Sequence, residues 1–336
     1  MAREAELRIP SGQRTATLYW GGGTPSVLPD AEFLSLNDAI RDRLDLADGA
    51  ECTLEVNPED VRADRLDLWR SGGFNRLSIG VQTFRDERLD WMGRPHRGRD
   101  AEDAVRRAQD AGFGNLSLDL IYGLPGSSLG EWQEQVGRAL ELGTPHLSAY
   151  ALTVEPRTAL AHDVATGRSE PPRDERAAED FLWFRAELER QGWEAYEVSN
   201  YAKPGWRAVH NSAYWSGSPY LGLGPGAHSF DGHRTRRANV RSNPEYQKAL
   251  SEGRRSGWFE LEVLSDQERF HEQLLTQLRR AEGLSRSMAS GRDLDRVWTK
   301  WIRQGMLASD ERGWRLQGEG WLWADAVAAD AFGVEA

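Results

Sequence analysis

Residues 77–82 read Leu-Ser-Ile-Gly-Val-Gln, a short apolar run that closes on a polar residue. Similar runs recur through the first half of the chain, at Thr17–Trp20, Cys52–Val56, Leu77–Val81, Leu116–Ile121 and Leu147–Leu152. They alternate only loosely between apolar and polar residues, which is typical of strands that are covered on both faces. We therefore predict that these runs form the buried strands of one sheet.

The segments between the runs carry helix signals. Asn57-Pro58 predicts a helix start and Gly72-Gly73 its end, while Asp100 is expected to cap a second helix. Ser127 or Ser128 is expected to cap a third helix. Repeated strand–helix units predict an α/β fold with a parallel sheet, as an open doubly wound sheet or an incomplete (β/α) barrel.

The composition excludes several classes of protein. A net charge of −11 disfavours non-specific nucleic-acid binding, and no apolar run is long enough for a membrane span. Cys52 is the only cysteine, so an internal disulfide framework is excluded and a cytoplasmic location is expected. Cys52 lies within an apolar run, where a thiol is typically a small core residue.

The sequence predicts three regions, at residues 1–170, 171–260 and 261–336. After Pro171-Pro172 a helix precedes a stretch rich in glycine and aromatic residues. From Ser265 onward the order of helix, helix (Leu294–Gln304), hairpin and final helix predicts a small winged-helix-like module. Its hairpin mixes acidic and basic residues, so we do not expect it to read DNA.

Four arginines form a basic stretch against the acidic balance of the chain, namely Arg234, Arg236, Arg237 and Arg241. The simplest interpretation is a solvated hairpin. A second interpretation is an anion clamp for a ligand that bears carboxylates, because arginine forms paired hydrogen bonds to carboxylates.

Polar residues stand at the predicted carboxyl ends of the strands, where parallel β/α folds gather functional groups. They are Gly21–Pro25, Glu55 with Asn57, Gln82, Asp119 and Tyr150. Each has an ordinary explanation as a cap or turn residue, but two carboxylates and an amide together suit ribose hydroxyls. Arg94 could bind a ligand carboxylate. We predict a nucleoside- or amino-acid-like ligand; a phosphate loop is less favoured because the glycine spacing fits neither common phosphate-binding motif.

A second cluster begins at His210 and includes Trp206, Tyr214, Trp215 and Tyr220. Aromatic walls beside an imidazole suit a flat, apolar ligand with a metal centre. His228 is expected to be a hydrogen-bonded structural residue, and would be the next candidate ligand. No Ser–His–Asp or HExxH pattern supports a hydrolase.

These motifs together resemble one family. They are Tyr19-Trp-Gly-Gly-Gly-Thr-Pro25, Glu55-Val-Asn-Pro58, Leu77-Ser-Ile-Gly-Val-Gln82, Gly93-Arg-Pro-His96, Asp119-Leu-Ile-Tyr-Gly-Leu-Pro125 and His210-Asn-Ser-Ala-Tyr214. The set is similar to the radical S-adenosylmethionine (SAM) family of oxygen-independent coproporphyrinogen III oxidases, and the last motif to its haem-chaperone branch. The resemblance spans nearly the whole chain and implies a partial (β/α) barrel followed by a smaller C-terminal region.

The resemblance also implies roles for individual residues. Gly22, Gly23 and Thr24 would contact the methionine part of SAM, Arg94 its carboxylate, and Glu55, Gln82 and Asp119 its ribose side. His210 would be the ligand of the haem iron, with Tyr214 as part of the haem motif.

One departure from the family pattern is the absence of its Cys-x₃-Cys-x₂-Cys loop, which precedes the Gly-Gly-Gly segment and holds a [4Fe–4S] cluster. We expect that the first strand–loop unit is missing, that an unpaired sheet edge results, and that this polypeptide does not cleave SAM. The leading hypothesis is a haem-binding chaperone, with possible homodimers. The alternatives are oxidative decarboxylation of coproporphyrinogen III and a degenerate haem-binding protein that needs no cluster.

Overall fold

The computed structural model describes residues 1–289 and 291–334. The chain forms two compact units: Met1–Thr17, Pro29–Ala50 and Ala208–Ala336 make the first, and Leu18–Leu28 and Glu51–Arg207 make the second. No helix in the described part of the chain combines the length and the apolar character that a membrane crossing requires. The division into three regions stays a prediction.

A seven-stranded sheet organises the first two thirds of the chain. Its strand order is β1 (Gln13–Trp20), β2 (Leu44–Val56), β3 (Arg76–Gln82), β4 (Asn115–Tyr122), β5 (His146–Ala151), β7 (Asn200–Ala202) and β6 (Glu194–Ala195). Strands β2 to β5 pair in parallel, whereas β7 pairs antiparallel with both β5 and β6. The α/β class and the five predicted strands are thus confirmed.

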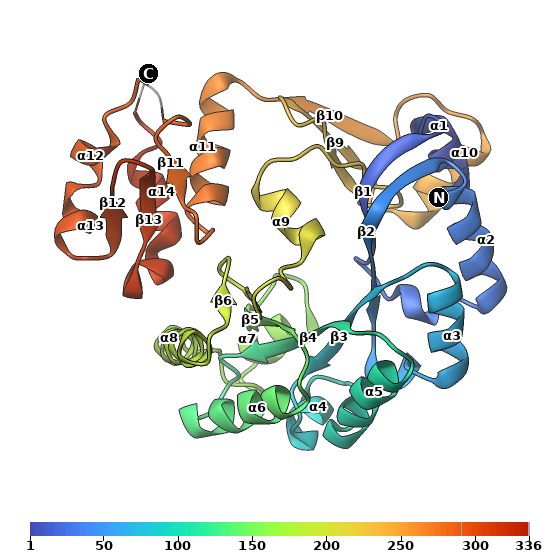
Figure 1. Ribbon diagram of the computed structural model, residues 1–336, viewed down its shortest axis with the longest axis horizontal. Helices are drawn as coiled ribbons and strands as arrows, with labels where there is room; N and C mark the ends of the chain where they lie inside the picture. The colour runs from blue at the N-terminus through green and yellow to red at the C-terminus, as the bar shows by residue number, and fades with distance from the viewer. Residues whose placement is uncertain (290, 335–336) are drawn as a thin grey trace. The chain divides into compact units, whose positions relative to one another are not determined.

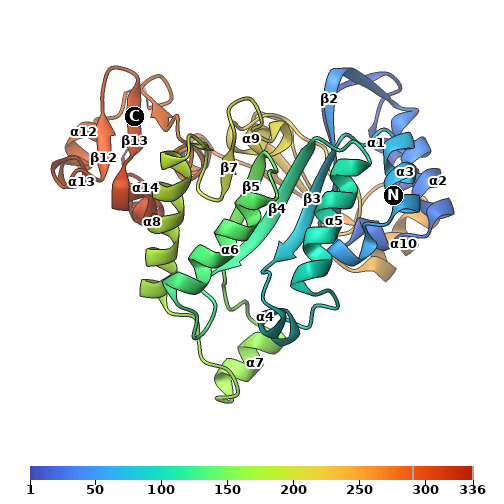
Figure 2. The same ribbon diagram turned by 60° about the horizontal axis from the view of Figure 1, so that its bottom comes forward.

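Helices connect the strands of this sheet. They are α2 (Asp30–Arg41), α3 (Ala63–Ser71), α4 (Asp86–Trp91), α5 (Gly98–Asp110), α6 (Leu129–Glu141), α7 (Ala159–Ala165) and α8 (Asp174–Arg190). Helices α5 and α6 lie over one face of β3, β4 and β5 (Figure 2). The strands are covered as their composition predicts: Leu77, Ile79 and Leu118 are fully buried.

Two predicted helix starts were wrong in detail. Pro58–Asp60 forms only a 3₁₀ turn, and α3 begins at Ala63, because the chain still has to leave the sheet after Pro58. Asp100 is the third residue of α5 rather than its cap, and its carboxylate accepts a hydrogen bond from the Arg97 N–H at 2.8 Å. Ser128 does cap α6, since its hydroxyl accepts a hydrogen bond from the Glu131 N–H at 3.2 Å.

In the first unit, α1 (Ala2–Arg8) is anchored by a buried carboxylate. Glu4 has no exposed surface and accepts hydrogen bonds from the Gly224 N–H, the Asn239 amide and the Tyr246 hydroxyl at 2.8, 2.8 and 2.6 Å. Arg8 pairs with Glu4 at 2.7 Å and also donates to the Gly222 carbonyl at 2.7 Å. These bonds fix the glycine-rich loop after residue 221 against α1.

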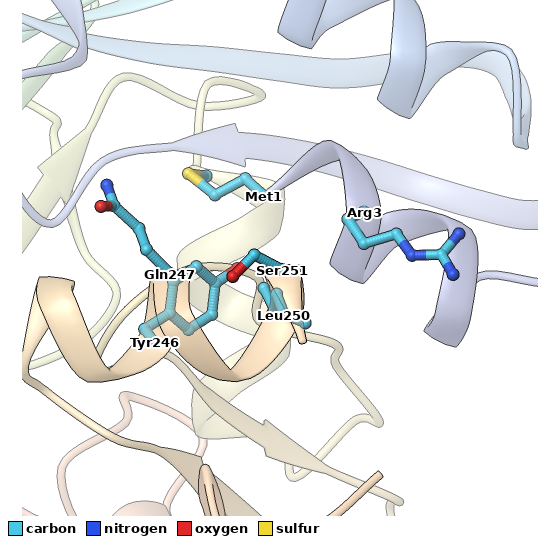
Figure 3. A pocket seen from close by; sticks show the side chains of 6 residues that line it. All are labelled: Met1, Arg3, Tyr246, Gln247, Leu250 and Ser251. Carbon is cyan, nitrogen blue, oxygen red and sulfur yellow. The ribbon is translucent and has the colours of Figure 1, made fainter. Parts of the chain in front are cut away.

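The first unit also contains α9 (Val209–Trp215), α10 (Asn243–Ser251), which lies beside α1, and a three-stranded antiparallel sheet (Figure 1). The sheet has the order β10 (Phe259–Val263), β9 (Thr235–Asn239), β8 (His228–Phe230). A cavity of about 430 Å³ lies between α1 and α10, lined by Met1, Arg3, Tyr246, Gln247, Leu250 and Ser251 (Figure 3). It contains none of the predicted site residues.

The C-terminal segment has the predicted winged-helix-like order. It consists of α11 (Asp266–Gln277), β11 (Leu284–Ser285), α12 (Leu294–Val297), α13 (Thr299–Arg303), β12 (Leu307–Ser309), β13 (Gly313–Leu316), the 3₁₀ turn Gly318–Trp323 and α14 (Ala324–Asp330). The strands form a small sheet of order β11, β13, β12. The predicted helix over 294–304 is broken at Trp298, whose buried indole donates to the Val327 carbonyl at 2.7 Å.

Two glycines in the second unit test the packing of its helices. A Cβ atom on Gly98, the first residue of α5, would overlap the Phe84 carbonyl group, so Gly98→Ala should destabilise the protein by about 1–3 kcal/mol. Gly137 in α6 has no atom within 4 Å of such a Cβ, so Gly137→Ala should stabilise by about 0.5–1 kcal/mol. Urea unfolding measures both; equal effects of the two variants would contradict the packing described.

Candidate functional site

Three strand ends of the second unit carry the predicted polar site. Glu55 lies opposite Ser78 in the β2–β3 register, and Ser78 lies opposite Ser117 in the β3–β4 register. The Ser78 hydroxyl is 3.0 Å from both carboxylate oxygens of Asp119, to which it donates. Parallel strands end at one sheet edge, and the register therefore places the two predicted carboxylates on β2 and β4, with Ser78 of β3 between them.

Glu55 organises the glycine loop that follows β1. Its carboxylate accepts a hydrogen bond from the Tyr19 hydroxyl at 2.5 Å and another from the Gly22 N–H at 3.0 Å. Burial and the Glu55 charge raise the pKa of the Tyr19 hydroxyl far above its usual range, so Tyr19 remains a donor. A Cβ on Gly21 would meet both side chains, which explains the glycine there. The Gly22 N–H, one of the donors expected to face a ligand, is bonded to Glu55.

Gln82 adopts an unusual backbone conformation at the end of β3. Its φ of 65° lies in the left-handed region, which is uncommon for residues other than glycine and is often found at functional sites. A Cβ on Gly80 would lie 2.9 Å from the Gln82 side-chain nitrogen and 3.7 Å from the side-chain Oδ1 atom of Asn57. The glycine at position 80 therefore leaves room for both amide side chains at this edge of the sheet.

Arg94 lies beside Asn57 at this edge of the sheet. Its guanidinium donates to the side-chain Oδ1 atom of Asn57 at 3.4 Å, and its side chain is half-buried. The neighbouring His96 is buried, with its ring 3.2 Å from both the Val81 carbonyl and the Glu59 carboxylate. Arg94 thus places a positive charge beside Asn57, whereas the buried His96 contacts the backbone of β3 and the Glu59 carboxylate.

Sequence reasoning gave no individual role to Tyr19 and Ser78, although both stand within the motifs that it used. Tyr19 holds Glu55 and Ser78 holds Asp119. A usable signal existed for Ser78, because it lies two and four residues before Gly80 and Gln82 and therefore shares their face of the strand.

The predicted haem residues lie in the first unit and form a separate group. The Nδ1 atom of His210, on α9, is 2.8 Å from the Thr17 hydroxyl oxygen. The His210 ring packs edge-on against Tyr214, with ring centroids 4.9 Å apart, and Tyr214 packs against Tyr220 at 4.5 Å. Trp206 belongs to the second unit, and His228 is exposed on β8. The structure thus joins His210, Tyr214 and Tyr220 and adds Thr17, which sequence reasoning missed.

Comparisons with known proteins agree with this arrangement of motifs. Residues 1–136 match the radical SAM superfamily. The haem chaperone HemW of Bacillus subtilis is 34% identical over 93% of this chain and 84% of its own length. HemW of Mycobacterium tuberculosis is 35% identical over 99% of this chain and 86% of its own. HemW of Escherichia coli is 42% identical over 66% of this chain and 58% of its own.

The chain belongs to the HemW family of radical SAM proteins. A solved structure of coproporphyrinogen III oxidase (HemN) from Escherichia coli, a radical SAM enzyme, matches this HemW-family chain with a TM-score of 0.83. The match covers 98% of this chain and 81% of that one at 23% identity, and it therefore concerns the fold alone. It confirms the predicted partial barrel with a smaller C-terminal region.

The iron–sulfur cluster of the superfamily does not fit the residues of this HemW-family chain. Cys52 is its one cysteine, and it is buried in β2, where its N–H donates to the Asn75 side chain at 2.9 Å. Within residues 1–289 and 291–334, no group of three or more His, Cys, Asp or Glu side chains could hold a metal ion. Three thiolates for a [4Fe–4S] cluster are therefore not supplied by these 336 residues.

The carboxyl of Asp119 should make stability depend on pH. Burial raises its pKa from 3.8 to about 6, against the hydrogen bonds from Ser78 and Ser148. The folded protein then binds more protons than the unfolded chain between about pH 4 and pH 6, so the free energy of unfolding falls as pH rises through this window. We expect Asp119→Asn to remove this pH dependence, which amounts to roughly 3 kcal/mol across the window.

Urea unfolding at several pH values measures this effect, with the exposed Asp67→Asn in the same unit as the control. A pH dependence that is identical in wild type and Asp119→Asn would show that the Asp119 carboxyl titrates normally.

Proposed function

We propose that this protein binds haem through His210 and transfers it to acceptor proteins as a haem chaperone. The observation that carries the proposal is the placement of His210 between Thr17 and Tyr214 at the start of an aromatic row. The relatives named HemW, which share 34–35% identity over almost the whole chain, support it. Haem is here the cargo.

The environment of His210 suits an axial ligand of haem iron. A ligating histidine usually has its second ring nitrogen hydrogen-bonded, which fixes the tautomer and the ring orientation. The Thr17 hydroxyl meets the Nδ1 atom of His210 in this way. Tyr214 and Tyr220 supply apolar ring surface beside the imidazole, as a flat porphyrin requires.

We further propose that the strand-end site of the second unit binds SAM without cleaving it. Asp119 and Gln82 offer acceptors and a donor for ribose hydroxyls, with Glu55 beside them on the ribose side. Gly23 and Thr24 next to Gly22 offer open backbone for the methionine part. Arg94 would bind the ligand carboxylate. Without cluster thiolates there is no electron source in this polypeptide for radical chemistry, so oxidative decarboxylation of coproporphyrinogen III is the weaker candidate.

Haem titration followed by the Soret band tests the first proposal. Wild type should shift the band of added haem, and His210→Ala should lose most of this shift. Thr17→Val should weaken haem binding by about ten-fold, since outer-shell partners typically contribute that much to the affinity of a metal ligand. His228→Ala, on the exposed β8 histidine, is the control. An unchanged affinity in His210→Ala would exclude His210 as the iron ligand.

Equilibrium dialysis with SAM and with decarboxylated SAM tests the second proposal. Arg94→Gln should weaken binding of SAM by about ten-fold or more, because a charge-assisted hydrogen bond contributes about 1.5–3 kcal/mol. Binding of the decarboxylated compound should not change, and Arg99→Gln on the exposed surface of α5 should affect neither. Equal losses for both compounds would contradict the assignment of Arg94 to the carboxylate.

A further inference from the structure

One face of the small sheet in the first unit combines aromatic rings with an arginine. In the register of this sheet, Phe230 of β8 lies opposite Arg236 of β9, and Arg236 lies opposite Glu262 of β10. Tyr220 forms a β-bridge with Phe230 on the other side. Directly opposed residues project from the same face of an antiparallel sheet, so Tyr220, Phe230 and Arg236 share one face.

This face continues to the proposed haem ligand through ring contacts. The centroids of Phe230 and Tyr220 are 6.4 Å apart, those of Tyr220 and Tyr214 are 4.5 Å apart, and those of Tyr214 and His210 are 4.9 Å apart. Tyr220 bridges Phe230, and Phe230 lies opposite Arg236, so the row reaches the strand that carries this guanidinium. Arg236 therefore stands at one end of the aromatic row and His210 at the other.

Arg236 of β9 and Arg234, just before this strand, each pair with a carboxylate of the chain itself. Arg236 pairs with Glu272 of α11 and lies 3.6 Å from Glu262, while Arg234 pairs with Asp266 at the start of α11. Gln277, at the other end of α11, donates to the Trp215 carbonyl of α9 at 2.6 Å. Helix α11 is thus attached to the sheet and to α9 by three polar contacts.

Arg237 has different partners from Arg234 and Arg236. It faces the other side of the sheet, where its guanidinium lies 4.4 Å from the Trp258 ring centroid and 3.4 Å from that of Phe259. Burial, together with the charge of Arg8, lowers the pKa of Arg237 to about 10. Arg237 is a packing residue, so the predicted anion clamp cannot use all four arginines.

We propose that Arg236 binds a propionate carboxylate of the haem whose iron His210 binds, and that Glu272 competes with that propionate for the guanidinium. The inference rests on the proposed haem function and adds the recognition of the haem edge to it. Arginine binds carboxylates through two parallel hydrogen bonds, so a propionate can take the place of the Glu272 carboxylate on the guanidinium.

The exposure of the pair makes this exchange accessible. The Arg236 side chain is 39% exposed and the Glu272 side chain 27%, so a ligand carboxylate can approach the guanidinium from solvent. Burial raises the pKa of Glu272, which means that its carboxylate is less well solvated than a free one and is held mainly by Arg236. Because Glu272 is part of α11, its replacement by a propionate also weakens one of the three contacts that attach α11.

Haem and haem dimethyl ester, which lacks the propionate charges, separate propionate recognition from iron ligation. Arg236→Gln should weaken binding of haem by about ten-fold, the effect of losing one charge-assisted hydrogen bond, and should leave the dimethyl ester unchanged. Glu272→Gln should strengthen binding of haem several-fold by freeing the guanidinium. The matched controls are Arg254→Gln and Glu252→Gln, which break a surface ion pair of 2.6 Å in the same unit.

The outcomes distinguish the inference from the proposed function. If wild type binds neither porphyrin, the haem function fails and the inference fails with it. If wild type binds haem but Arg236→Gln weakens haem and ester equally, the arginine acts through packing and the inference alone is overturned. An unchanged or lower haem affinity in Glu272→Gln would show that Glu272 does not compete with the propionate for Arg236. Should Arg236→Gln not fold, Arg236→Lys keeps the charge without the paired geometry and should weaken haem selectively.

Discussion

Burial of strands β3 and β4 on both faces is the constraint from which the strand-end site follows. Leu77, Ile79 and Leu118 are fully buried on one face and Ser117 is fully buried on the other, so the few polar groups on these strands must form hydrogen bonds with one another. Ser78 does so with Asp119 on the next strand. Since parallel strands end at a common edge, the same constraint gathers Glu55 and Gln82 there, and partial burial of this edge raises the pKa of Asp119.

Glu4 and Glu272 of the first unit differ in burial, and this difference decides whether each carboxylate keeps its arginine or can give it up to a ligand. Glu4 has no exposed surface and accepts bonds from four groups, including Arg8, so removal of any partner would leave a buried charge poorly compensated. Glu272 is partly exposed and is held mainly by Arg236. The first arrangement fixes the glycine-rich loop against α1, whereas the second can yield its arginine to another carboxylate.

Membership of the HemW family does not by itself define the chemistry of these 336 residues. The superfamily match and the HemN-like fold account for the partial barrel, yet the single buried cysteine cannot supply the thiolates of a cluster. Haem binding and SAM binding are proposed at groups of residues in different units, and they can therefore be tested independently. A haem carrier of this design needs iron ligation and recognition of the haem edge, and the first unit contains candidates for both.

The sequence by itself determined the α/β class, the five main strands, the winged-helix-like order and the candidate site residues, because apolar periodicity and ordered motifs are local properties of the chain. The sequence misplaced the start of α3. Pro58 begins a 3₁₀ turn, and the path by which the chain leaves the sheet delays the helix until Ala63. Only the tertiary structure decided that Tyr19 holds Glu55, that Thr17 meets His210, and that Arg236 and Arg237 face opposite sides of their sheet with different partners. Each of these contacts joins residues far apart in sequence, or depends on strand register and on which face packs, and no local pattern encodes them.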